Sequence, residues 1–303
     1  MAGARIAAVD MGGTKIKACL FEDGVCVERA ETDSEARQGG GRLLSNAAGV
    51  LRGFGAFDAL GVSTAGQVDP AWGTIRYAND NIPGYTGADV KGWFTECFAK
   101  PVAVLNDVYA AALGEGTHGA AVGERDYICL TYGTGIGGGV VLDGALYYGA
   151  GASAGVMLGG ILTHPEHAVP GDAFSGTYER YASTTALMAA ARAADPALTS
   201  GRALFTRLDE PLVKGVVDRW LDEVAAGICT LVHAFNVPCV VLGGGVMEQP
   251  YAIEGARRRV AERLIPGFRG VRVEGARLGN MAGLYGAARL AEQLLGPDDE
   301  NEE

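Results

Sequence analysis

Short apolar runs alternate with longer amphipathic stretches along the whole chain. In its first part, the apolar runs predict strands at residues 5–9, 15–21, 25–30, 59–63 and 102–105. Between the second and third of these, Glu22-Asp23-Gly24 is a hairpin signal, because Asp-Gly adopts the backbone conformation of a tight turn. Apolar residues at helical spacing predict helices near 42–53, 87–98 and 107–116.

The same order returns in the second part of the chain. Strands are predicted at 126–131 and 138–142, on either side of a glycine-rich turn, and Asp143-Gly144 again indicates a hairpin. The later patterns predict helices near 178–193 and 213–236, a buried strand at 239–242 and a helical segment at 278–295. A hairpin around a glycine turn followed by alternating helices and strands thus occurs twice. This repetition predicts an α/β protein of two lobes, with mixed sheets flanked by helices.

Composition narrows the class of protein. The 303 residues are enough for two compact cores, and 48% of them are hydrophobic. A net charge of -11 provides no basic field for nucleic acid or for an anionic membrane. No apolar run reaches membrane-spanning length, and the N-terminus leads directly into a strand without the pattern of a signal peptide. These features predict a cytoplasmic protein that acts on small molecules.

The six cysteines are scattered, and none forms a CxxC pair. They are Cys19, Cys26, Cys97, Cys129, Cys229 and Cys239. Because most of them lie in apolar runs, we expect buried thiols in a reducing compartment rather than disulfides. The acidic end, 296–303, is expected to be a solvated tail.

Two glycine-rich turns, about 120 residues apart, carry the candidate chemistry. The first is DMGGTK at 10–15 and the second is YGTGIGGG at 132–139. Glycine lets backbone N–H groups approach phosphate oxygens, and each turn adds a threonine hydroxyl. The predicted phosphate ligands are Gly12, Gly13, Thr14, Lys15, Gly133, Thr134 and Gly135. Two such turns, one in each half, indicate a nucleotide phosphate chain held across a cleft, and therefore a phosphotransferase.

Asp10 precedes the first turn at a strand end, where a carboxylate could hold Mg²⁺ through water beside the phosphates. The alternative is an ordinary β-hairpin. The spacing is not that of a P-loop, and a strand rather than a helix follows the turn. A third turn, Gly243–Gly245, follows a fully apolar strand; it could lie against an adenine ring or simply turn the chain. The second turn could likewise be a bend where backbones pack closely.

Asn106 and Asp107 end a buried strand and begin a helix. Asp107 could serve only as an N-cap, which is a frequent role of aspartate at that position. The carboxyl end of a strand is also where open α/β sheets place their chemistry. There, Asp107 could accept the proton of a hydroxyl that attacks phosphorus.

Together these segments resemble the ROK family of sugar kinases and repressors, within the actin-like ATPase superfamily. The matching segments are 10–15, 81–85 (NIPGY), 105–115 (LNDVYAAALGE), 130–139, 178–187 (YERYASTTAL), 240–246 (VVLGGGV) and 278–287. The resemblance covers nearly the whole chain in the order of the family. It implies an actin-like ATPase (ribonuclease H-like) fold with lobes at 1–117 and 118–288, and a C-terminal helix of about 289–303 that packs back on the first lobe.

The resemblance also implies roles for residues. Asp107 would be the general base on the sugar hydroxyl, commonly O6. Asn81, Asn106 and Glu179 would contact other parts of the sugar. The first two turns would hold the phosphates of ATP, with Mg²⁺ at Asp10, and Gly243, Gly244 and Gly245 would border the adenosine. A homodimer is common in the family.

The chain departs from the family at two places. Many members carry an AGE(I/L/F)GH segment whose Glu and His bind the sugar; here it is AGVMLGG at 154–160, with Val156 for the Glu and Gly159 or Gly160 for the His. Pro170, Asp172 and Thr177 stand where cysteines of a zinc motif would be, and His164 and His167 alone are poor zinc ligands. We therefore expect no structural zinc, and an acceptor with a blocked or modified C1–C2 end.

A different class of function fits the altered sugar segment: a non-catalytic sugar sensor of the same family that acts through a protein partner. Repressors of the family carry a helix-turn-helix segment before the first turn, whereas here that turn begins at Asp10. Direct DNA binding is therefore not expected. The phosphate turns and Asp107 favour the kinase.

Overall fold

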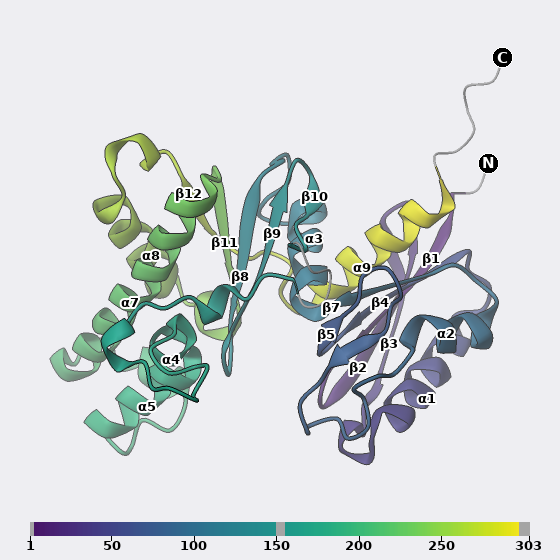
Figure 1. The fold of residues 1–303 in the computed structure, drawn as a ribbon, viewed down its shortest axis with the longest axis horizontal. Helices are drawn as coiled ribbons and strands as arrows, with labels where there is room; N and C mark the ends of the chain where they lie inside the picture. The colour runs from purple at the N-terminus through teal and green to yellow at the C-terminus, as the bar shows by residue number, and fades with distance from the viewer. Residues whose placement is uncertain (1–2, 150–154, 297–303) are drawn as a thin grey trace. The chain divides into compact units, whose positions relative to one another are not determined.

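The computed structural model describes residues 3–149 and 155–296, which form two compact units (Figure 1). The first unit comprises the described residues of 3–119, 146–155 and 280–296. The second comprises 120–145 and 156–279. Each unit is a five-stranded sheet covered by helices, so the predicted α/β class is confirmed.

The sheet of the first unit has the strand order β3-β2-β1-β4-β7. Its strands are β1 (Arg5–Met11), β2 (Lys15–Glu22), β3 (Val25–Asp33), β4 (Ala59–Thr64) and β7 (Val102–Asn106), and a separate small hairpin pairs β5 (Gln67–Val68) with β6 (Ile75–Tyr77). β1 pairs antiparallel with β2 and parallel with β4, which in turn pairs parallel with β7. The strands predicted in this part of the chain are all present.

The side chains of β1 alternate between two layers of helices. Ala7, Val9 and Met11 belong to one hydrophobic cluster together with residues of α1 (Gly40–Leu51) and α2 (Val90–Phe98). Ile6 and Ala8 belong to another cluster, with residues of α9 (Ala282–Glu292). Because successive side chains of a strand point to opposite faces, the next member of the α9 face is Asp10.

The helix α9 packs closely against α3 (Asp107–His118) in the first unit (Figure 1). A Cβ atom at Gly286 would overlap the carbonyl group of Ala110, and one at Gly114 would overlap that of Ala282. Residues 280–288 therefore belong to the first unit, whereas the family resemblance had implied that they belong to the second lobe. Of the helix predicted at about 289–303, residues 297–303 lie outside the described residues.

The second unit repeats the topology of the first, with the strand order β10-β9-β8-β11-β12. The strands are β8 (Tyr127–Tyr132), β9 (Ile136–Leu142), β10 (Ala145–Leu146), β11 (Cys239–Gly243) and β12 (Arg272–Gly275). β8 pairs antiparallel with β9 and parallel with β11. Each sheet therefore has a hairpin around a glycine turn followed by parallel strands, as the repeated pattern predicted.

The helices of this unit are α4 (Tyr178–Ala182), α5 (Thr184–Ala194), α6 (Gly201–Phe205), α7 (Pro211–Phe235) and α8 (Pro250–Arg263). The single helix expected at 178–193 is wrong, because Ser183 is extended and its Oγ caps α5 by accepting the Ala186 N–H at 3.2 Å. Within 3–149 and 155–296, no helix has both the length and the apolar character needed to cross a membrane.

The cysteine prediction is wrong for one pair, because Cys19 of β2 and Cys26 of β3 form a disulfide. The register of the β2–β3 pair shifts by one residue after Leu20, so that Cys26 lies opposite Phe21. This bulge turns Cys26 to the same face of the hairpin as Cys19. The other cysteines form no disulfide among the described residues: Cys129, Cys229 and Cys239 are buried, as expected, whereas Cys97 is partly exposed.

Candidate active site

Asn106 and Asp107 lie where β7 ends and α3 begins. The Oδ1 atom of Asn106 accepts the N–H groups of Val108 at 3.0 Å and Tyr109 at 3.4 Å, so Asn106 is the N-cap. Its Nδ2 donates to the carbonyl oxygen of Gly66 and to Oδ1 of Asp107, both at 2.9 Å. Asp107 Oδ1 also accepts the Val108 N–H at 2.8 Å. Asn106 therefore caps the helix and also orients the carboxyl group of Asp107.

The carboxyl group of Asp107 has a higher pKa than an ordinary aspartate. Although the residue keeps access to solvent, its pKa is raised to about 6, mainly by desolvation in the surrounding protein and also by the negative charge of Asp10. A carboxylate with this pKa is still ionised at neutral pH but is a stronger base than an ordinary aspartate. It is therefore suited to remove a proton from a hydroxyl group.

Asp10 lies near the end of β1 on the face that α9 covers. Burial raises its pKa, while a hydrogen bond from Ser63 Oγ at 2.6 Å and the charge of Lys17 act in the opposite direction. A Cβ atom at Gly283 would lie 3.4 Å from Asp10 Oδ1 and only 3.0 Å from Ser63 Oγ, so α9 packs directly against this pair of side chains. Sequence reasoning missed Ser63, Lys17 and Gly283, because they lie on other strands or at the far end of the chain.

Asp10 could hold Mg²⁺, since a dication there would offset the repulsion between the carboxylates of Asp10 and Asp107. Among the described residues, no group of three or more His, Cys, Asp or Glu side chains comes together. The ion would therefore take its other ligands from phosphate and water, which is the usual arrangement for Mg²⁺.

The first glycine turn is a closed hairpin turn. Its Gly12 N–H donates to the Lys15 carbonyl oxygen at 3.0 Å, which leaves Gly13 and Thr14 at the exposed tip. The ammonium group of Lys15, predicted to bind nucleotide, lies 2.9 Å from Asp33 and 3.5 Å from Glu31 on the neighbouring strand. The hydrogen bond to Asp33 raises the pKa of Lys15, and its charge is balanced within the hairpin.

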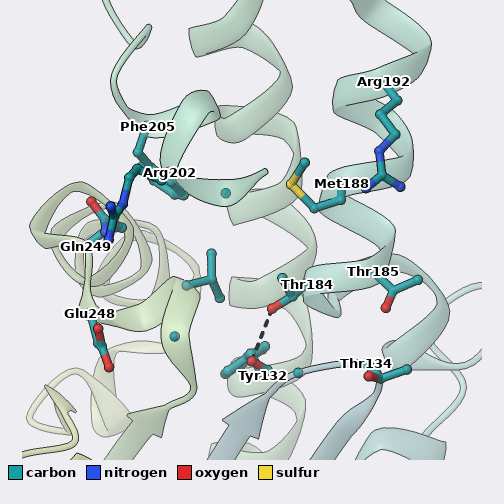
Figure 2. Close-up of a pocket in the computed structure, with 14 residues that line it drawn as sticks. Tyr132, Thr134, Thr184, Thr185, Met188, Arg192, Arg202, Phe205, Glu248 and Gln249 are labelled. Atoms are coloured by element: carbon teal, nitrogen blue, oxygen red, sulfur yellow. Dashed lines mark hydrogen bonds between the residues drawn. The ribbon is translucent and has the colours of Figure 1, made fainter. Parts of the chain in front are cut away.

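The second glycine turn borders a pocket of about 620 Å³ in the second unit (Figure 2). The Gly133 N–H donates to the Gly135 carbonyl oxygen at 3.0 Å, so Thr134 occupies the exposed tip. Of the residues predicted to bind nucleotide, Gly133, Thr134 and Gly245 line this pocket. Its size is suitable for a nucleoside.

Most of the pocket wall was not predicted. Figure 2 shows Met188 and Phe205 as apolar walls, and Arg192, Arg202 and Gln249 as polar ones. They come from α5, α6 and the start of α8, which carry no glycine or acidic motif. The only sequence signal was the Ser-Thr-Thr segment that begins α5, whose Thr184 and Thr185 also line the pocket.

The third glycine turn is constrained by the backbone. Gly244 has a φ of 99°, and a Cβ atom there would overlap the carbonyl group of Tyr132. Gly243 pairs with Thr131 at the end of β11. Gly244 therefore lets the third turn approach Tyr132 closely, while Gly245 faces the pocket.

Glu179 lies behind the second turn. Its Oε2 accepts the Ile136 N–H at 3.4 Å, and a Cβ atom at Gly135 would lie 2.7 Å from the same oxygen. A Cβ atom at Gly159 would overlap the Ile136 carbonyl oxygen, whereas one at Gly160 would be 3.6 Å from Met157. A side chain could therefore be accommodated at 160 but not at 159. Val156 packs against the core of the second unit, and Ala154 lies outside the described residues.

Other predicted positions lie on loops. Asn81 is exposed, and its backbone N–H donates to Asn79 Oδ1 at 3.1 Å. His164 stacks on Tyr181 with ring centroids 3.8 Å apart, and His167 Nδ1 lies 2.6 Å from the Tyr181 hydroxyl. These two histidines are thus engaged with an aromatic side chain.

Comparison with known proteins gives consistent matches over nearly the whole chain. A model of the ROK family matches residues 6–294. A ROK hexokinase structure from Thermus thermophilus is 34% identical, with a TM-score of 0.82 over 96% of this chain and 99% of that one. A ROK family glucokinase from Streptomyces griseus, in complex with glucose and AMPPNP, is 28% identical, with a TM-score of 0.78 over 95% and 99%. A β-glucoside kinase of Listeria monocytogenes is 30% identical over 93% of this chain and 96% of its own length.

Proposed function

The chain belongs to the ROK family, and on that premise we propose that it is an ATP-dependent sugar kinase. The reaction would transfer the γ-phosphoryl group of ATP to the O6 hydroxyl of a hexose, a glycoside or a modified sugar. The observation that carries the proposal is Asp107: Asn106 orients it at the start of α3, and its pKa is raised to about 6. A sensor that only binds sugar has no need of such a base.

In this mechanism, Asp107 accepts the proton of the acceptor hydroxyl as its oxygen attacks the γ-phosphorus atom. The bond from phosphorus to the bridging oxygen breaks, and ADP leaves. The exposed turn tips, Gly13 with Thr14 and Thr134, offer N–H groups and hydroxyls to the phosphate oxygens. Mg²⁺ held at Asp10 would neutralise charge on the phosphates. The pocket of the second unit would hold the nucleoside.

We propose that Asn81, Asn106 and Glu179 bind the acceptor. Because Val156 packs on the core and Gly160 carries no side chain, the two polar groups that would bind the C1–C2 end of plain glucose are missing. The acceptor is therefore a glycoside or a modified hexose, in agreement with the β-glucoside kinase among the relatives. We also propose a cytoplasmic homodimer, as is common in the family.

The test is ADP release from MgATP with a panel of hexoses, methyl glycosides and amino sugars. Wild type is expected to phosphorylate at least one of them, and Asp107→Asn to lose about 10²–10⁴-fold in kcat. Asp209→Asn is the matched control, since it removes one exposed carboxylate outside both sites. Undiminished turnover in Asp107→Asn would show that Asp107 is not the general base. Sugar binding without turnover by wild type would favour the sensor.

A further inference from the structure

The turn at 132–136 is attached from behind to the corner between α4 and α5. Thr184 Oγ1 donates to the Tyr132 carbonyl oxygen at 3.1 Å, the bond drawn in Figure 2, and the Thr184 N–H donates to the Gly133 carbonyl oxygen at 3.0 Å. On the other side of the turn, Glu179 Oε2 accepts the Ile136 N–H at 3.4 Å. The turn is thus held at both of its ends by residues five positions apart.

This corner is itself fixed by buried groups. Ser183 is extended, so α4 and α5 meet at an angle, and Thr184 and Glu179 can reach opposite ends of one turn. The buried Tyr178 hydroxyl donates to the Val224 carbonyl oxygen at 2.8 Å and lies 2.7 Å from the Tyr132 hydroxyl. The corner therefore does not shift freely, and the side chain of Glu179 is the movable part of the attachment.

The glycines around Glu179 show how closely it fits. Its Oε2 would be 2.7 Å from a Cβ atom at Gly135 and 3.2 Å from one at Gly159. Side chains at these positions would push the carboxylate away from the turn. The carboxylate thus fills the space between the turn and the 3₁₀ turn Leu158–Gly160, which is where the family pattern places a sugar-binding histidine.

We propose that Glu179 is a positioning residue of the phosphate-binding turn, through which acceptor binding changes nucleotide affinity. The proposal rests on the proposed function in one respect, that Glu179 also receives a hydroxyl of the acceptor. A carboxylate that accepts both a sugar hydroxyl and the Ile136 N–H must take a position that suits both. Acceptor binding therefore shifts the turn and changes its affinity for the nucleotide phosphates. By linkage, nucleotide binding changes the affinity for the acceptor by the same factor.

The experiment measures MgADP binding by calorimetry, alone and with saturating glucose or methyl β-glucoside. In wild type, we expect the acceptor to change the Kd of MgADP about tenfold, and MgADP to change the Kd of the acceptor by the same factor. In Glu179→Met, which keeps the length of the side chain but removes the acceptor oxygens, the factor should fall to near one. Glu262→Met, at an exposed glutamate on α8, is the matched control and should keep the wild-type factor. Wild-type coupling in Glu179→Met would overturn the proposal.

A second measurement decides the case if Glu179→Met no longer binds sugar. Amide hydrogen exchange of the peptide containing Ile136 should become at least about threefold faster in Glu179→Met without ligand, at unchanged Tm. Unchanged exchange there would overturn the positioning role. Both MgADP binding and amide exchange can be measured even if no sugar is phosphorylated. Failure of the proposed kinase function can therefore be distinguished from failure of the positioning role of Glu179.

Thr184 provides an independent check of the attachment. Thr184→Val should weaken MgADP binding about fivefold, and Thr184→Ser should restore it, because serine keeps the hydroxyl. Thr230→Val removes a similar hydroxyl bond to a helix carbonyl group at an exposed position of α7, and it should have no effect. Equal MgADP affinity in Thr184→Val and wild type would contradict the attachment.

Discussion

The most informative single residue is Asp107, whose raised pKa leads to a pH dependence. Activity should fall as pH drops through about 6, because the base becomes protonated. Asp10→Asn removes the negative charge that contributes to the shift, so the acidic limb of kcat/KM for the acceptor should move to lower pH, even though the rate itself also falls. Asp209→Asn should leave the limb in place. An acidic limb unchanged or moved to higher pH in Asp10→Asn would contradict this electrostatic interpretation.

Acceptor choice is a second property of single residues. The variant Val156→Glu/Gly160→His restores the two polar groups of the family pattern, and the structure leaves room for a side chain at 160. We expect kcat/KM for glucose to rise about tenfold relative to methyl β-glucoside, because hydroxyl groups at C1 and C2 gain partners. Gly267→His, on an exposed turn with open space around it, should leave the ratio unchanged. If the ratio of kcat/KM for glucose to that for methyl β-glucoside were unchanged in the double variant, residues 156 and 160 would not determine the choice of acceptor.

At the scale of elements, the β2–β3 hairpin carries the disulfide that the sequence did not predict. Thiol titration of the unfolded, unreduced protein should therefore find four thiols, Cys97, Cys129, Cys229 and Cys239, and reduction should expose two more. Losing the pair should cost about 2 kcal/mol of stability, because the cross-link restricts the unfolded chain. Cys26→Ser should lower Tm, and the Tm of this variant should no longer depend on reductant. The Tm of Cys97→Ser should still fall when reductant is added. Six thiols before reduction would show that the pair does not form.

The packing of α9 on α3 gives another test at this scale. Gly286→Ala would drive a methyl group into the carbonyl group of Ala110, so we expect a loss of about 3 kcal/mol in the free energy of unfolding. Gly49→Ala is the control, since it is an exposed helical glycine of α1 with open space around it. It should stabilise the protein by about 0.5–1 kcal/mol. Chemical denaturation measures both, and equal stability of Gly286→Ala and wild type would contradict the close contact.

Which elements could be predicted depended on the strength of their local patterns. The strands β1, β4, β7 and β11 each contain an uninterrupted apolar run, so their positions followed directly from the sequence. The helix α8 was missed because its charged residues hide the apolar face; Arg259 is buried there only because it pairs with Asp218 and Asp222 of α7. The end of α4 at Ser183 was missed because serine is tolerated within helices.

On the scale of the whole molecule, the glycine turns and the strand-end aspartates were visible in the sequence, but their surroundings were not. Two neighbours of Asp10, Ser63 of β4 and Gly283 of α9, are more than 50 residues away in the chain and reach it only through the tertiary fold. The pocket of the second unit likewise gathers Met188 of α5, Arg202 of α6 and Gln249, the N-cap of α8. Contacts of this kind follow from tertiary packing and leave no local motif.

The proposal that the first and second glycine turns bind the phosphates of one nucleotide predicts how ligands protect each unit from amide hydrogen exchange. The pocket lies wholly in the second unit, so adenosine alone should slow amide hydrogen exchange around Thr134, Met188 and Val246 but leave 10–15 unchanged. MgAMPPNP, which adds the phosphates, should also slow exchange in 10–15, because the N–H groups of Gly13 and Thr14 would bind oxygen. Gly245→Val should abolish the first protection by filling the pocket, whereas Gly267→Val should not. If MgAMPPNP left 10–15 unprotected while protecting the pocket, the first turn would not be a phosphate ligand, and the second turn alone would have to bind the phosphate oxygens.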